Sequence, residues 1–151
     1  MKVKILFPAI ALGLIVSMGI YFLVNPSYER SLEAKYYYET RQYQKAYELA
    51  NEAFRMDPYN RMASTIMAQS KTSMKYQKYV TQAKEYMREI NEIIAQPIIS
   101  DADRAKIKMM SEIMVDSYVK LAPSVITDKA LVQEAARYYK SFEQILEKVS
   151  R

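Results

Sequence analysis

Residues 26–58, PSYERSLEAKYYYETRQYQKAYELANEAFRMDP, decide the fold of this chain. The stretch predicts one helix over residues 27–40 and a second over 43–56, with a corner at Arg41-Gln42. Alanine recurs where two helices must approach closely, and tyrosines surround those positions. The alanines are Ala34, Ala46, Ala50 and Ala53. Helices this short are marginal in water on their own, so the pair must bury one face of each helix.

This hairpin aligns with a known repeat signature, W-x2-L-G-x2-Y, then A-x3-F, then P, with alanine replacing the glycine and the phenylalanine. Ala34 stands at the glycine, Tyr37 at the tyrosine, Ala46 at the alanine, Ala50 at the phenylalanine and Pro58 at the closing proline. On these residues the hairpin resembles one tetratricopeptide (TPR) repeat, a helical pair that proteins stack to form a groove for other proteins. The alternative interpretation is an ordinary helical hairpin.

Two departures from the signature concern the outer surface of the first helix. Arg30 and Glu33 stand at the tryptophan and leucine positions. This surface is therefore expected to face water, as suits a first repeat directly after an anchor.

A second, degenerate hairpin is expected over residues 58–96. The tetrapeptide QYQK at 42–45 recurs as KYQK at 75–78. Asp57 is expected to cap the first helix of this pair, with Pro58 at the first helical position.

The rest of the soluble part also predicts helices. Both glycines of the chain lie in its first 24 residues, so tight β-turns and a β-rich domain are not expected. A long C-terminal pair is expected over 100–149, opened by a capping box of Ser100 and Asp103 and continued by a helix capped by Thr127 or Asp128. The apolar stripes of this pair predict a core or, alternatively, a contact with a helix of another chain. The expected fold is all-α: one transmembrane helix, then a TPR-like stack of about six antiparallel helices.

The N-terminal segment predicts a membrane anchor. Residues 5–24 carry no charge and, as a helix, are long enough to cross a hydrocarbon core of ~30 Å. A cleaved signal peptide is the alternative, but it needs an apolar run of only ~7–15 residues and a small-residue cleavage site. We therefore divide the chain into a transmembrane signal anchor, 1–25, and a helical domain, 26–151.

Lys2 and Lys4 set the expected orientation of the anchor. Positive charge is retained on the cytoplasmic side, so the N-terminus is expected inside and the helical domain outside. In a bacterium this describes a single-pass inner-membrane protein with a periplasmic domain.

Small residues recur every four positions in the anchor, at Ala9, Gly13 and Ser17. They fall on one face of a helix and predict close packing against another membrane helix. The alternative is that small residues are common in any membrane helix.

The composition excludes several classes of chemistry. The chain has no Cys and no His, so zinc and most transition-metal sites are not expected, and no catalytic, cofactor-binding or metal-ligating residue is predicted. The chain has 22 Lys and Arg against 17 Asp and Glu; without Lys2 and Lys4 the ratio is 20 to 17. The two signs are interleaved, so a basic stripe for nucleic acid is absent.

The resemblance to the TPR family implies a protein-binding groove lined by the inner helices. The residues carried onto this sequence are Tyr28, Ser31, Lys35, Tyr38, Met62, Thr65, Gln69 and Thr72. The four from the first helix, residues 28 to 38 of this list, combine one cation and one hydroxyl with two tyrosine rings. This combination suits an acidic or aromatic partner segment. Ser31 and Lys35 stand where some members carry the first Lys and Asn of a carboxylate clamp, so that clamp is not expected here. The alternative is a solvated face.

These observations predict a membrane-anchored scaffold or adaptor that binds another protein of the cell envelope. Such a module would be an accessory subunit of a larger machine for secretion, motility or envelope assembly. The alternative is a periplasmic chaperone that holds unfolded or assembling envelope proteins, which would expose apolar patches and bind many clients. An enzyme would need convergent carboxylates in a pocket. A receptor on the cytosolic face of an organelle would need the opposite membrane topology, with the helical domain in the cytosol.

Overall fold

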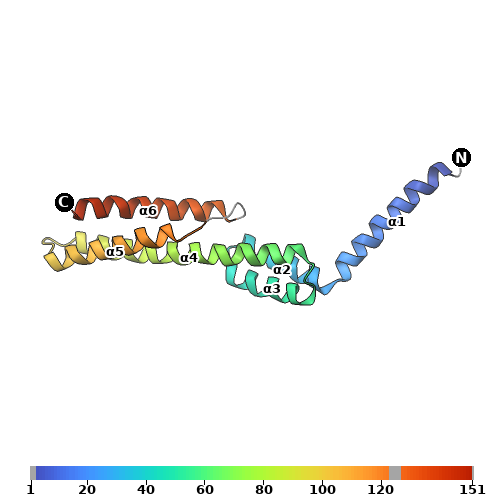
Figure 1. The fold of residues 1–151 in the computed structure, drawn as a ribbon, viewed down its shortest axis with the longest axis horizontal. Helices are drawn as coiled ribbons and strands as arrows, with labels where there is room; N and C mark the ends of the chain where they lie inside the picture. The colour runs from blue at the N-terminus through green and yellow to red at the C-terminus, as the bar shows by residue number, and fades with distance from the viewer. Residues whose placement is uncertain (1–2, 123–126, 151) are drawn as a thin grey trace. The chain divides into compact units, whose positions relative to one another are not determined.

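A computed structural model describes residues 3–122 and 127–150, with the backbone alone for 3–6, 22 and 23. This part of the chain forms six helices (Figure 1): α1 (Val3–Val24), α2 (Pro26–Glu39), α3 (Tyr43–Met56), α4 (Arg61–Ile94), α5 (Asp101–Val119) and α6 (Lys129–Val149). The all-α class is confirmed for the described residues. The chain divides into two compact units, Met1–Lys71 and Thr72–Arg151, and α4 contributes to both.

The first unit contains the predicted hairpin. The side chain of Asn25 accepts a hydrogen bond from the backbone of Ser27 at 3.0 Å and so caps α2. At the other end Arg41 has a φ of 62°, in the left-handed region. The amide of Arg41 donates to Tyr38 O at 3.0 Å, and that of Gln42 donates to Tyr37 O at 2.9 Å. These two bonds are a Schellman motif, which ends α2 and turns the chain into α3.

Small side chains bring α2 and α3 together as expected. Ala34 of α2 and Ala46, Ala50 and Ala53 of α3 are completely buried. Ala34, Ala46 and Ala50 also pack with Ile66 of α4, so the start of α4 completes this core.

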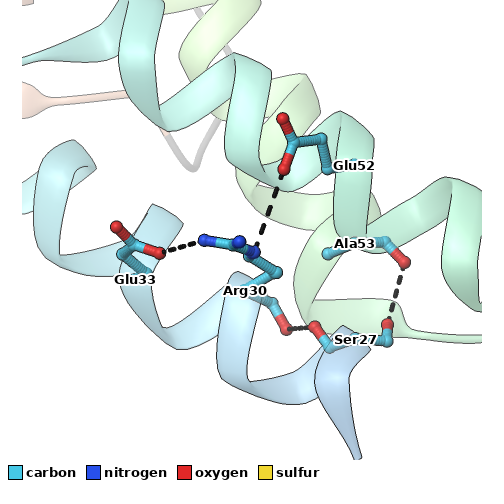
Figure 2. Close-up of polar contacts among 6 residues, drawn as sticks. Ser27, Arg30, Glu33, Glu52 and Ala53 are labelled. Carbon is cyan, nitrogen blue, oxygen red and sulfur yellow. Dashed lines mark hydrogen bonds and ion pairs between the residues drawn. The ribbon is translucent and has the colours of Figure 1, made fainter.

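The surface around Arg30 and Glu33 is polar, as these two residues predicted. The Arg30 guanidinium lies 3.0 Å from the Glu33 carboxylate and 3.9 Å from that of Glu52 on α3 (Figure 2). All three side chains are 40% exposed or more. Pairs so exposed add little to stability.

The second hairpin expected over 58–96 is wrong, because α4 is one continuous helix from Arg61 to Ile94. No glycine or proline lies between Asn60 and Gln96, so nothing in this stretch breaks the helix. Met74, which the offset of 33 residues aligns with Arg41, lies inside α4. Five helices therefore follow α1 within the described residues, rather than about six.

The start of α4 also differs from the expectation that Asp57 caps it. The Asp57 carboxylate accepts a hydrogen bond from the amide of Tyr59 at 2.9 Å and belongs to the turn before the helix. Asn60 is the cap, since its side-chain oxygen accepts from the amide of Ala63 at 3.1 Å.

The predicted caps of the C-terminal pair are confirmed. Ser100 Oγ accepts from the amide of Asp103, while the Asp103 carboxylate accepts from the amide and hydroxyl of Ser100 at 3.1 and 2.6 Å. These hydrogen bonds, led by that from the hydroxyl, hold the pKa of the Asp103 carboxyl below its usual value. Asp128 caps α6 through the amides of Ala130 and Leu131.

The second unit packs α5 and α6 with the C-terminal part of α4. The Lys84 ammonium of α4 lies 2.8 Å from the Glu134 carboxylate of α6. Apolar stripes along α4, α5 and α6 supply most of its buried residues, and Tyr76 and Tyr79 of α4 are buried beside them. Near the end of α4, Ile93 is 6% exposed and Ile94 is 52% exposed. The buried stripe residues are Val80, Ala83, Ile90, Ile107, Met110, Met114, Leu131, Ala135 and Phe142.

Candidate protein-binding site

A groove of about 450 Å³ runs between the end of α2 and the start of α4. It lies within the first unit. Its lining residues are Lys35, Tyr38, Glu39, Arg61, Met62, Thr65, Ile66 and Gln69.

The floor of the groove is apolar and continuous with the core. Ile66 is 4% exposed, and Tyr38 and Met62 are half-buried against the cluster that contains Ala34 and Ala46. The ring of Tyr38 also lies 5.4 Å from that of Tyr43, which holds it in place. The floor is therefore part of the folded hairpin and is formed before any partner arrives.

The rim of the groove is charged. The Lys35 ammonium lies 3.8 Å from the Glu39 carboxylate, one helical turn along α2. Arg61 is exposed and has no ion-pair partner in the part of the chain that the structure describes. Two cations and one carboxylate thus surround an apolar floor, an arrangement that matches a partner segment with both apolar and acidic side chains.

Five of the eight residues predicted for the groove line it: Lys35, Tyr38, Met62, Thr65 and Gln69. The sequence did not indicate Glu39, Arg61 or Ile66, although each lies one helical turn or one position from a predicted residue. Helical spacing from Lys35, Met62 and Thr65 was the signal that would have found them.

The prediction for Ser31 is wrong, because its side chain is completely buried. Tyr28 is half-buried with its ring 6.5 Å from that of Tyr21, and it does not line the groove. Thr72 belongs to the second unit and does not line it either.

A buried polar network fixes the two walls beside the groove. Asn60 Nδ2 donates to Ser27 Oγ and to Ser31 Oγ, each at 2.9 Å, and lies 3.2 Å from Ser27 O. Ser27 Oγ donates to Ala53 O of α3 at 2.8 Å (Figure 2), and Ser31 Oγ donates to Ser27 O. One asparagine therefore connects the starts of α2 and α4 with the end of α3, and α2 and α4 run in the same direction.

The first helix, α1, presents apolar side chains to its surroundings. Phe7, Leu12, Leu14 and Ile15 are each more than 60% exposed. No single helix in the part with described side chains is long and apolar enough for a membrane span, whereas the stretches Phe7–Tyr21 and Pro26–Glu39 meet that test together as a pair bent by 71°. An N-terminal hydrophobic segment is thus present.

The small residues predicted for helix packing lie on this segment. Ala9, Gly13 and Ser17 are exposed, and Ser17 Oγ donates to Gly13 O at 2.7 Å. A methyl group added at Gly13 would meet no other described atom. Their predicted role in packing against a membrane helix stays a prediction.

Other hollows of the described surface lie along α4, beside the junction of α1 and α2, and against α6. The one of about 630 Å³ is lined by residues of α4 alone, between Met74 and Tyr86. Among the described residues no group of three or more carboxylates is placed to hold a metal ion.

No protein-family model, curated protein or solved structure matches this chain.

Proposed function

We propose that the protein is a single-pass, membrane-anchored scaffold with a TPR-like hairpin, which binds a segment of another envelope protein in the groove between α2 and α4. The observation that carries this proposal is the groove itself, with its apolar floor of Tyr38, Met62 and Ile66 and with Arg61, which pairs with no carboxylate among the described residues. In the TPR family the inner helices of successive repeats line such a groove. The shared direction of α2 and α4 supports the same use here.

The N-terminal segment supports the proposed location of the protein in the membrane. The exposed apolar side chains of α1 between Phe7 and Tyr21 are unfavourable in water and favourable in lipid. Lys2 and Lys4 precede it, which favours a cytoplasmic N-terminus. The groove then lies outside the cytoplasm, in the periplasm of a bacterium, next to other envelope proteins. The segment is proposed to remain uncleaved, and the protein to act by binding rather than by catalysis.

The groove is tested by reversing the charge of Arg61. We expect Arg61→Glu to reduce the amount of partner that co-purifies with the detergent-solubilised protein about tenfold, equivalent to about 1.4 kcal/mol, because attraction for an acidic segment becomes repulsion. Acidic residues stabilise the first turn of a helix, so this change does not weaken α4.

The matched control is Arg55→Glu, in the last turn of α3 and away from the groove lining. A glutamate there is less compatible with the helix dipole than one at position 61, so it tests stability more severely. Equal recovery of partner by the wild type and both variants would contradict binding in this groove.

A further inference from the structure

The outward side of α2 carries an exposed apolar strip. Its residues are the half-buried Tyr28 and the exposed Leu32 and Tyr36, which lie four positions apart and therefore on one helix face; we call them the α2 strip. Leu32 is 54% exposed and Tyr36 is 62% exposed. Tyrosine has an apolar ring and a polar tip, a combination that is enriched where hydrocarbon meets the lipid headgroups.

The α2 strip begins beside the proposed anchor. Only Asn25 separates the end of α1, at Val24, from the start of α2, at Pro26. The first turn of α2 therefore cannot leave the membrane surface when α1 is in the bilayer. Tyr36 follows ten residues after Pro26, about 15 Å along the helix, so the whole strip fits on the surface if α2 lies flat. The 71° bend between the two segments agrees with such a course.

We propose that α2 lies on the membrane surface with the α2 strip in the headgroup region, an inference that rests on the proposed anchor. The occupant of the strip is lipid. A helix in this position buries its apolar face ~5–10 Å into the boundary between headgroups and acyl chains. Lys35 lies beside the strip on the side of the groove, and Glu39, three positions after Tyr36, ends the strip at the rim of the groove. The groove therefore opens along the membrane surface, where it receives a juxtamembrane segment of another membrane protein.

The charges of α2 determine which type of lipid its contact with the membrane surface requires. The helix carries three glutamates, Glu29, Glu33 and Glu39, against Arg30 and Lys35. Attraction to anionic lipid does not hold such a helix down, so its contact with the surface depends on the apolar strip. The contact is expected in phosphatidylcholine vesicles and is insensitive to salt.

The test uses the absence of tryptophan from the chain. Single variants Leu32→Trp and Tyr36→Trp of the full-length protein are reconstituted in phosphatidylcholine vesicles, with and without brominated acyl chains that quench tryptophan fluorescence. Ile15→Trp in α1 reports on the anchor. Glu48→Trp is the matched control: it is exposed on α3, and the contact of Ser27 with Ala53 places it level with Leu32 along the hairpin.

We expect brominated lipid to quench Trp emission at positions 15, 32 and 36 and to leave that at position 48 unchanged. Quenching at 15 with water-exposed, unquenched emission at 32 and 36 would overturn the surface position of α2 and leave the anchor intact. Absence of quenching at 15 would overturn the anchor and this inference together. Equal quenching at 32 and 48 would also contradict it, because the whole hairpin would then lie in lipid.

Discussion

Replacing Asn60 by alanine lowers the free energy of unfolding of the first unit by about 3 kcal/mol, through a lost helix cap (~1 kcal/mol) and a buried network left without its donor (~1–3 kcal/mol). Asn60 is completely buried, and its oxygen is the acceptor for the buried amide of Ala63. Without Nδ2, Ser27 and Ser31 also lose the bond that joins α2 to α4. The loss appears as a lower midpoint of helix unfolding in a denaturant titration of the detergent-solubilised protein, followed by circular dichroism.

Two further variants separate the cap from the network. Asn60→Ser keeps a good capping oxygen and removes Nδ2, so its cost is expected between those of the wild type and Asn60→Ala. Asn91→Ala, at an exposed site in the same helix, is expected to change stability by less than about 0.5 kcal/mol. A midpoint for Asn60→Ala equal to that of Asn91→Ala would show that the network does not hold the helices together.

Two lysines in the middle of α1 remove the protein from the membrane. Replacing both Leu14 and Ile15 by lysine costs about 6–8 kcal/mol of insertion free energy, since lysine is unfavourable by ~2.5–3.5 kcal/mol at a helix centre where Leu and Ile are favourable. The measurement is the fraction that stays in the membrane pellet after an alkaline carbonate wash. The double alanine variant at the same positions keeps the helix and is expected to stay in the pellet.

The mass of the wild-type protein separates an anchor from a cleaved signal peptide. The full chain has a mass of 17.6 kDa, and an uncleaved anchor preserves it. A shorter mature chain, or a double-lysine variant that remains in the pellet, would contradict the anchor.

The sequence predicted the helix ends that depend on local chemistry. Ser100 with Asp103, and Asp128 before α6, are caps whose partners lie within three residues. Ala34 and Ala46 also indicated where α2 and α3 touch, since a close helix contact admits only small side chains. These features can be predicted from the sequence because the residues that form them lie at fixed, short spacings along the chain.

The errors came from a weak repeat and from contacts between distant residues. The KYQK at 75–78 copies a corner sequence without the Schellman motif around Arg41, and so α4 continues through it. The resemblance to TPR repeats implies that Ser31 lies on the groove surface. It is buried because Asn60, 29 positions later in the chain, donates to it, a contact that helical spacing cannot reveal.

The groove could be predicted only in part for the same reason. Lys35, Tyr38 and Thr65 follow from the family's inner-helix positions. Arg61 could not be predicted because its place at the rim depends on where α4 begins. The helix begins after the cap at Asn60 rather than at Pro58.

Site-specific photo-crosslinking in living cells tests the central claim most directly. A photoreactive residue at Thr65, which is exposed and lines the groove, is compared with one at Glu48 on the exposed side of α3. The proposal predicts one dominant crosslinked membrane protein from position 65 and none from position 48. Many weak adducts from position 65 would instead indicate a chaperone that holds varied clients, and capture from position 48 alone would contradict the groove as the binding site.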